Sequence, residues 1–188
     1  MFKESEATEH FLCFINEGRA ERPPFKVYSI ELSEKEDFWI IGSNVIDPYP
    51  QYGGVYGYLL NNKTGEVIVC GCDQSPKDYI QDLYDVETAN GKNYVLRFSC
   101  NDEKRDLIDI KNSLGINYQQ ARFLVRERQV WFLGIKRHLS YVKKELEKNG
   151  IHTEIIITNK NDALIDIEED RLWLHPALKM LYLYLEGK

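Results

Sequence analysis

The segment from Tyr52 to Cys72, YGGVYGYLLNNKTGEVIVCGC, restricts the possible folds more than any other part of the chain. It contains two short apolar runs, VYGYLL and EVIVCG, separated by NNKTG, whose residues tolerate left-handed backbone angles. This order predicts a β-hairpin. Gly53, Gly54 and Gly57 are followed by a strand and not by a helix, so they do not match a phosphate-binding loop. We expect these glycines to allow close backbone approach in an antiparallel sheet.

Two more β-strands are predicted before this hairpin, in FKVYSIEL and DFWIIGSNVI, because both runs are rich in β-branched and aromatic residues. A helix is predicted over Glu4–Asn16, where apolar residues recur at near-helical spacing. A second helix is expected in SPKDYIQDLYDV, with Ser75 as its N-cap and Pro76 at its first position. The first half of the chain therefore predicts three or four antiparallel strands with helices against the sheet.

The polar, turn-rich stretch ETANGKN predicts a boundary near Asn90. Beyond it, strand and helix patterns follow one another in the order βααβαβ, with glycines ending two of the helices. We expect an antiparallel α+β domain over residues 1–90, a smaller βααβαβ subdomain over 91–159, and an acidic link with an apolar helix over 160–188. The predicted fold class is α+β: an antiparallel sheet with flanking helices, the smaller subdomain, and a C-terminal helix.

The closing helix, predicted over Arg171–Glu186, is too rich in Leu and Tyr to stand free in water. It docks either on its own chain or on a second copy of the chain, and we favour docking within the chain. A monomer and a homodimer both fit this pattern.

The charge of the chain narrows the classes of partner. Thirty acidic residues against 24 basic ones give a net charge of −6, which repels nucleic acid and favours encounter with a basic partner. No apolar run approaches the ~20 residues that a membrane-spanning helix needs, and the initial MFKESEATEHF lacks the order of a secretory signal. We expect a cytoplasmic protein that binds neither nucleic acid nor membranes.

Side chains that could perform catalysis or hold a metal are present, but they match no known motif. Cys70 and Cys72 would point to one face of a strand, and no second cysteine pair completes a zinc knuckle. None of the four histidines stands in a HExxH or C-x-x-C-H arrangement, and no serine lies in G-x-S-x-G. We expect no enzyme activity, catalytic residue, metal or cofactor. A cleft in which histidine and carboxylate groups converge would favour an enzyme instead.

Aromatic residues crowd around the end of the second predicted strand, in and beside DPYPQYGG. Tyrosine and tryptophan offer large, stiff, amphipathic contact area, so this cluster suits a protein interface. The candidate partner-binding residues are Trp39, Asp47, Tyr49, Tyr52, Tyr56 and Tyr58. The alternative is that Trp39 and the two tyrosines of the following strand alternate into the core. Tyr49 and Tyr52, in a loop between prolines and glycines, are then the exposed candidates.

The stretch from Asp37 to Asp85, with a strand, the YLLNNKTGEV hairpin and a short helix after SP, resembles the bacterial family called immunity protein 35. The resemblance covers about a quarter of the chain. It implies an immunity protein that neutralises a cognate toxin in bacterial competition, by protein–protein interaction and without chemistry of its own. The expected partner is a basic protein toxin, which a sheet with exposed aromatic and acidic side chains would cover.

The stretch from Tyr94 to Ile157 is similar to the C-terminal domain of the ribosomal stalk protein of the large subunit, in LGINYQQARFLV and YVKKELEKNGIHTEI. The similarity implies a shared fold. The stalk domain recruits translation factors through a basic, apolar helix face, whereas the matching helix here, DEKRDLIDIKNSL, is partly acidic. The alternative function is a translation- or ribosome-associated adaptor, which requires Lys104, Lys111 and apolar residues to share one helix face.

Overall fold

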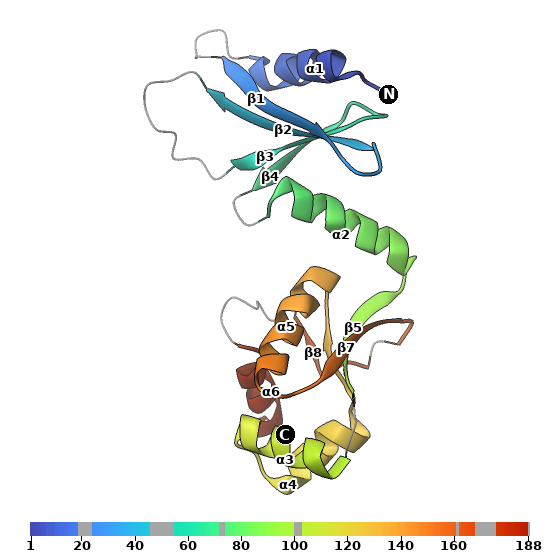
Figure 1. The fold of residues 1–188 in the computed structure, drawn as a ribbon, viewed down its shortest axis with the longest axis vertical. Helices are drawn as coiled ribbons and strands as arrows, with labels where there is room; N and C mark the ends of the chain where they lie inside the picture. The colour runs from blue at the N-terminus through green and yellow to red at the C-terminus, as the bar shows by residue number, and fades with distance from the viewer. Residues whose placement is uncertain are drawn as a thin grey trace. The chain divides into compact units, whose positions relative to one another are not determined.

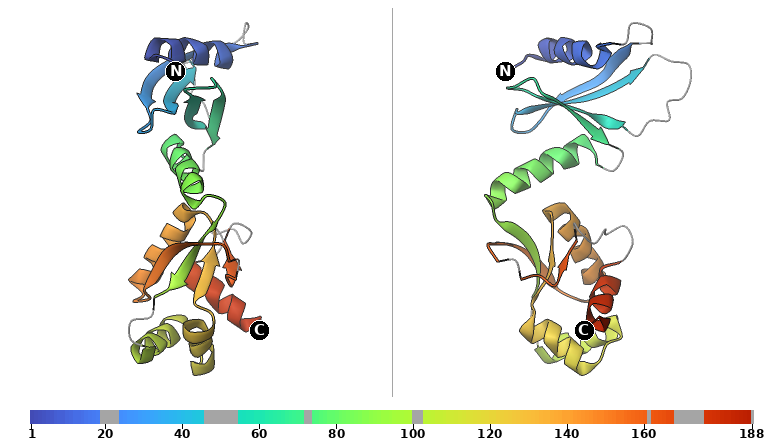
Figure 2. Two further views of the ribbon diagram at one scale, coloured as in Figure 1. Left: turned by 90° about the vertical axis from the view of Figure 1, so that its right-hand side faces the viewer. Right: turned by 180° about the vertical axis from the view of Figure 1, so that it is seen from behind.

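The computed structural model describes residues 1–18, 24–45, 55–71, 74–99, 103–160, 162–167 and 176–187. Within these residues the protein is α+β, as the sequence predicts, with two four-stranded sheets (Figure 1). The chain divides into two compact units, Met1–Leu83 and Tyr84–Lys188, here called unit 1 and unit 2. Each unit contains its own sheet, which can be followed in the further views of Figure 2. Each unit also has its own core.

Unit 1 is a β-meander with a helix on one face. Helix α1 (Glu4–Asn16) precedes four strands that pair antiparallel in chain order. The strands are β1 (Phe25–Leu32), β2 (Phe38–Val45), β3 (Val55–Asn61) and β4 (Val67–Gly71). The predicted hairpin is confirmed, with β3 and β4 as its arms. Asn61 closes its turn, because Asn61 Oδ1 accepts hydrogen bonds from the backbone N–H groups of Lys63 and Thr64 at 2.9 and 3.0 Å.

The core of unit 1 lies between α1 and the sheet (Figure 1). Ala7 and Phe11 of α1 are fully buried, and the Phe11 and Tyr58 rings pack with centroids 5.0 Å apart. Alternation along the strands sends every second side chain to this face, including Trp39 and Ile41 of β2. A helix of 13 residues is marginal alone, so α1 gains much of its stability by burying this apolar stripe.

The start of helix α2 (Pro76–Ala89) lies against the opposite face of this sheet. A Cβ added to Gly57 would lie 3.0 Å from the Pro76 ring, so β3 and α2 approach closely there. The expected close approach is thus confirmed at Gly57, while the two glycines before it in GGVYG lie outside the described residues. The Ser75 hydroxyl oxygen accepts a hydrogen bond from the Asp78 N–H at 3.2 Å, as expected for an N-cap.

Unit 2 has the predicted βααβαβ order, followed by a short strand and a helix. Its elements are β5 (Asn93–Phe98), α3 (Glu103–Leu114), α4 (Tyr118–Arg122), η1 (Phe123–Glu127), β6 (Val130–Leu133), α5 (Lys136–Lys148), β7 (Thr153–Thr158), β8 (Ile165–Asp166) and α6 (Ala177–Glu186). The sheet order is β7-β5-β6-β8, in which β6 and β8 are parallel and the other neighbours are antiparallel. The second predicted helix is α4 continued by η1, which is a π-helical segment.

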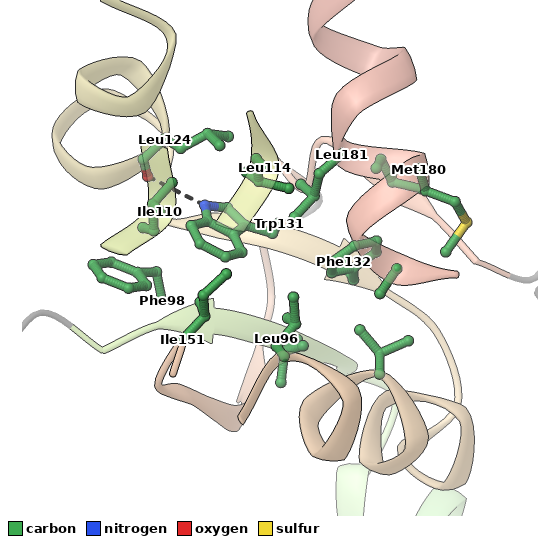
Figure 3. Close-up of a cluster of buried hydrophobic side chains, with 14 of the residues drawn as sticks. Leu96, Phe98, Ile110, Leu114, Leu124, Trp131, Phe132, Ile151, Met180 and Leu181 are labelled. Atoms are coloured by element: carbon green, nitrogen blue, oxygen red, sulfur yellow. Dashed lines mark hydrogen bonds between the residues drawn. The ribbon is translucent and has the colours of Figure 1, made fainter. Parts of the chain in front are cut away.

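The helices of unit 2 enclose a core on one face of its sheet (Figure 3). Trp131 and Phe132 of β6 are fully buried there, among side chains from α3, α5 and α6. The Trp131 and Phe98 rings stack with centroids 5.1 Å apart. Met180 and Leu181 bring α6 into the same core, so the expected docking of the closing helix within the chain is confirmed.

The division into units differs from the predicted boundary near Asn90, because it falls inside α2. The second half of α2 is attached to unit 2 by polar contacts. Lys136 Nζ donates to the buried Asp85 carboxylate at 2.8 Å, and the Tyr94 hydroxyl donates to the Asp85 carbonyl oxygen at 2.9 Å. The boundary between the units therefore lies within a helix, and the expected turn, at Asn90 and Gly91, follows α2 inside unit 2.

The described residues 162–167 and 176–187 likewise belong to unit 2. Ile165 and Ile167 are 5% and 2% exposed and belong to the core of unit 2 with α6. Ile165 also pairs with Phe132 in the parallel β6–β8 ladder. Residues of the predicted acidic link thus complete the sheet and core of unit 2.

Candidate functional site

The aromatic residues that the structure describes around β2 and β3 form a core and not a contact surface. Trp39 is 8% exposed and Tyr58 is 5% exposed, and both lie under α1. Trp39 pairs with Leu60 across the β2–β3 ladder, and Tyr58 pairs with Ile41, so all four side chains share the face that α1 covers. The assignment of Trp39 and Tyr58 to a partner surface is therefore wrong, and the alternative placement in the core is correct for both.

The other predicted contact residues have no described side chain. Tyr56 belongs to β3, where only its backbone is described. Asp47, Tyr49 and Tyr52 fall outside the described residues altogether. Their contribution to partner binding stays a prediction.

One buried side chain attaches the start of α1 to the sheet. Asn62, directly after β3, is 2% exposed. Its Oδ1 accepts hydrogen bonds from the Phe2 backbone N–H at 2.8 Å and from Trp39 Nε1 at 3.1 Å. Its Nδ2 donates to the Glu36 carbonyl oxygen at 2.7 Å. The residues before α1, the core tryptophan and the β1–β2 turn are thus held by one amide group.

Halfway along α1, His10 makes a second link to the hairpin. Its Nε2 donates to the Gly65 carbonyl oxygen at 2.9 Å, and its ring lies against Phe2 with centroids 5.2 Å apart. Gly65 has a φ of +76°, and a Cβ there would lie 3.0 Å from His10 Nε2. The position of α1 on the sheet is therefore determined at two points, and His10 has a structural role.

On its outward side, α1 presents what we call the acidic helix face: Glu6, Glu9, Cys13 and Glu17. These residues recur at spacings of three and four and are all exposed; the last of them, Glu17, is the C-cap directly after the helix. Phe14, next to Cys13, is 48% exposed. Acidic side chains around an accessible aromatic ring suit contact with a basic protein surface.

The negative charge of the chain is concentrated in the unit that carries this face. Residues 1–83 contain seven Lys or Arg and 14 Asp or Glu, which gives a net charge of −7. Residues 84–188 contain 17 Lys or Arg and 16 Asp or Glu, which gives a net charge of +1. The two net charges together give the −6 of the whole chain. The whole-chain charge therefore understates the negative potential around unit 1.

A second surface of interest lies on α3 in unit 2. This helix buries Leu107, Ile110 and Leu114. Ile108, by contrast, is 56% exposed. Lys104 and Lys111 are exposed four residues before and three residues after it, so the three side chains share one stripe, here called the α3 stripe. On this helix two lysines thus flank one exposed apolar residue, and a role as a stalk-like adaptor stays a prediction.

The described residues form no cluster of three or more His, Cys, Asp or Glu side chains that could hold a metal ion. Cys70 is buried in the sheet of unit 1, and burial raises the pKa of its thiol, which disfavours the reactive thiolate. Cys72 and His175 lie outside the described residues. In the described part of the chain, no helix is long and apolar enough to cross a membrane.

Comparison with known proteins found no matching protein-family model, no matching curated protein and no matching solved structure. The acidic helix face and the α3 stripe are therefore interpreted from their own chemistry. The acidic helix face was missed from the sequence, although glutamates recur at helical spacing in EATEHFLCFINE. For the α3 stripe, the sequence pointed to Lys104 and Lys111 but not to the isoleucine between them in KRDLIDIK.

Proposed function

We propose that this protein is a bacterial immunity protein that binds a basic cognate toxin through the acidic helix face and neutralises it by occlusion. The observation that carries the proposal is the net charge of −7 on unit 1, with exposed glutamates gathered on the outward side of α1. The resemblance of residues 37–85 to the immunity protein 35 family supports the same function.

Charge and shape act at different stages of such a binding reaction. Complementary charge steers the two proteins together and raises the association rate. Phe14 offers an apolar anchor, which slows dissociation once water is excluded around it. Because Asn62 and His10 hold α1 on the sheet, the face is ordered before the partner arrives and little conformational entropy is lost on binding.

The test uses the polypeptide encoded by the reading frame next to this gene. If that polypeptide is a toxin, cells that produce it should grow only when this protein is co-expressed, and the two proteins should co-purify. The double substitution Glu9→Lys with Glu17→Lys reverses two exposed charges of the acidic helix face. It should lower the association rate roughly tenfold or more at low salt and abolish the rescue of growth.

The matched control is Glu34→Lys with Glu66→Lys, because both residues are exposed in unit 1 outside α1 and the change in net charge is the same. This control should still rescue growth. Full rescue by the Glu9 and Glu17 variant, or equal loss in both variants, contradicts the assignment of the contact surface. If the adjacent frame encodes no toxin and no such domain is neutralised, the immunity function itself is wrong.

The α3 stripe favours a second candidate function, an adaptor associated with translation or the ribosome. Its lysines flank an isoleucine that is 56% exposed, which suits an acidic amphipathic helix of a partner. Sedimentation with purified ribosomes, and pull-down of translation GTPases, test this function. Ile108→Glu should abolish binding, whereas Val86→Glu, at an aliphatic position 64% exposed, should not. Failure of the unaltered protein to bind either target counts against the adaptor.

A further inference from the structure

Unit 2 contains a cavity lined by cationic side chains, here called the basic cavity. Its volume is about 370 Å³, and Arg97, Arg126, Arg128 and Lys160 line it. They come from β5, from η1 and the residues after it, and from the chain that follows β7. Four cations around one small space repel one another unless anions lie among them. Two carboxylates, Glu127 and Asp162, also line the cavity, so an anionic ligand is expected only at the cations that no carboxylate pairs.

The four cations differ in how far they are already neutralised. Arg97 donates from Nε and Nη2 to one carboxylate oxygen of Glu154, at 2.9 and 2.5 Å, across the β5–β7 ladder. Arg126 is ion-paired with a glutamate of α3. Among the described residues, Arg128 and Lys160 take part in no ion pair. These two charges are available to a ligand.

The backbone beside the cavity is held in place by hydrogen bonds. Trp131 Nε1 donates to the carbonyl oxygens of Leu124 at 3.1 Å and Arg128 at 2.9 Å, the first of which is drawn in Figure 3. The Phe98 N–H donates to the Gln129 carbonyl oxygen at 2.7 Å, and the Arg128 N–H reaches the first carbonyl oxygen of η1 at 2.9 Å. π-Helical turns occur frequently at functional sites. The cationic side chains thus project from a backbone that needs little further ordering to bind a ligand.

We propose that the basic cavity binds a small phosphorylated sugar, a class that includes sugar phosphates and nucleoside monophosphates. Arg128 and Lys160 suit the phosphate, because guanidinium and ammonium groups both donate hydrogen bonds to phosphate oxygens. Glu127 and Asp162 also line the cavity, and carboxylates accept hydrogen bonds from hydroxyl groups. A ligand with one anionic end and several hydroxyl donors matches this mixture better than a simple anion, which the carboxylates repel.

The size of the basic cavity favours a small ligand over a polymer. Its volume lies within the range of roughly 300–1,000 Å³ that is typical of small-molecule sites. Val130 and Ile156 supply an apolar part of the wall, against which a sugar ring or a base can pack. This site lies in unit 2, whereas the acidic helix face lies in unit 1.

Isothermal titration calorimetry of the full chain with ribose 5-phosphate and with adenosine monophosphate tests the proposal. At least one of the two should bind, and ribose should bind at least tenfold more weakly than its phosphate. Arg128→Gln and Lys160→Gln should each weaken phosphate binding roughly 10- to 100-fold, as expected for the loss of one charged hydrogen bond. Lys144→Gln, exposed on α5 and away from the cavity lining, removes the same charge and should leave binding unchanged.

Several results would overturn the proposal. The first is that neither phosphate probe binds with a dissociation constant below about 1 mM. The second is that ribose binds as tightly as ribose 5-phosphate. The third is that Lys144→Gln weakens binding as much as Arg128→Gln does. Circular dichroism of each variant shows that a loss of binding is not a loss of folding. A single-stranded oligonucleotide is the last probe. If it binds more tightly than adenosine monophosphate, the cationic surface belongs to nucleic-acid binding and the small-ligand proposal is wrong.

Discussion

Replacing Asn62 with leucine should destabilise unit 1 by about 2–4 kcal/mol. The side chain of Asn62 is almost fully buried and makes three hydrogen bonds, two accepted by Oδ1 and one donated by Nδ2. Leucine has a similar shape and no polar atom. The loss of stability therefore comes from the hydrogen bonds that the former partners of Asn62 no longer make, and not from poorer packing.

The magnitude follows from what each partner can do after the change. Trp39 is 8% exposed, so its indole N–H stays buried without an acceptor, which costs about 1–3 kcal/mol. The Phe2 N–H and the Glu36 carbonyl oxygen belong to residues nearer the surface and can bind water, so together they lose only about 1 kcal/mol. The same change frees the start of α1, which carries the acidic helix face.

Hydrogen exchange followed by mass spectrometry measures this loss, because it resolves each unit where a whole-chain unfolding curve mixes the two. Amides of β2 and β3 should exchange roughly 30- to 700-fold faster in Asn62→Leu, if exchange occurs by unfolding of unit 1. Amides of β5 in unit 2 should keep their rates. Asn44→Leu is the control, since Asn44 is exposed on β2.

Two results would refute the reasoning. The first is an acceleration of less than about threefold, which corresponds to under about 0.7 kcal/mol and means that water replaces the amide. The second comes from a Trp39→Phe background, in which the indole N–H is absent. Asn62→Leu should cost at least about 1 kcal/mol less there. Equal costs in both backgrounds would show that the buried indole is not the source of the loss.

Three further predictions concern single side chains. Gly65→Ala should cost about 1–2 kcal/mol in hydrogen exchange of β3 and β4, because φ is +76° and the new Cβ would lie 3.0 Å from His10 Nε2. Glu145→Gln should lower the free energy of opening of α6 by about 1 kcal/mol, which hydrogen exchange measures as faster exchange of its amides. The reason is that the Glu145 carboxylate accepts a hydrogen bond from the first N–H of that helix at 2.9 Å. A hydrogen bond to Asp85 raises the pKa of Lys136, so this pair stabilises unit 2 fully below the ordinary lysine pKa of about 10.4. That stability is lost as the pH rises through the higher folded value, and Asp85→Asn should reduce the alkaline fall in the urea midpoint.

Each of these predictions has a control or a contrary result. Gly115 also has a positive φ, +65°, but open space around it, so Gly115→Ala isolates backbone strain and should cost less than Gly65→Ala. Unchanged exchange of α6 in Glu145→Gln would show that the carboxylate does not cap the helix. An alkaline transition unaltered by Asp85→Asn would assign the titration to another group.

The parts of the fold with local signals could be predicted from the sequence. The β3–β4 hairpin is an example, because Asn61 accepts hydrogen bonds within its own turn and Gly65 adopts the positive φ that the turn requires. The two-residue strand β8 could not be predicted, because it exists by pairing with Phe132, far earlier in the chain. The π-helical geometry of η1 could not be predicted either, because the Trp131 indole, which lies outside this helix, forms hydrogen bonds to carbonyl oxygens in it and directly after it.

The surfaces were harder to predict than the fold, because alternation along a strand does not say which face a helix will cover. Trp39 and Tyr58 fit the inward or the outward face equally well until α1 is placed. The cationic residues of the basic cavity were hidden for another reason. Arg97, Arg128 and Lys160 come from separate segments, and only the folding of β5, η1 and β7 brings them to one cavity.

The two proposed sites carry opposite charge, which allows them to be distinguished in one preparation. Polylysine should compete for the acidic helix face, where Glu9 and Glu17 lie, and should slow toxin association without changing sugar-phosphate binding. Excess ribose 5-phosphate should do the reverse, because it occupies Arg128 and Lys160 and leaves the acidic helix face free. Raising the salt concentration screens both sites, so salt dependence alone does not separate them. If one of these competitors blocked both reactions, the two surfaces would be coupled, and separate roles for unit 1 and unit 2 would be wrong.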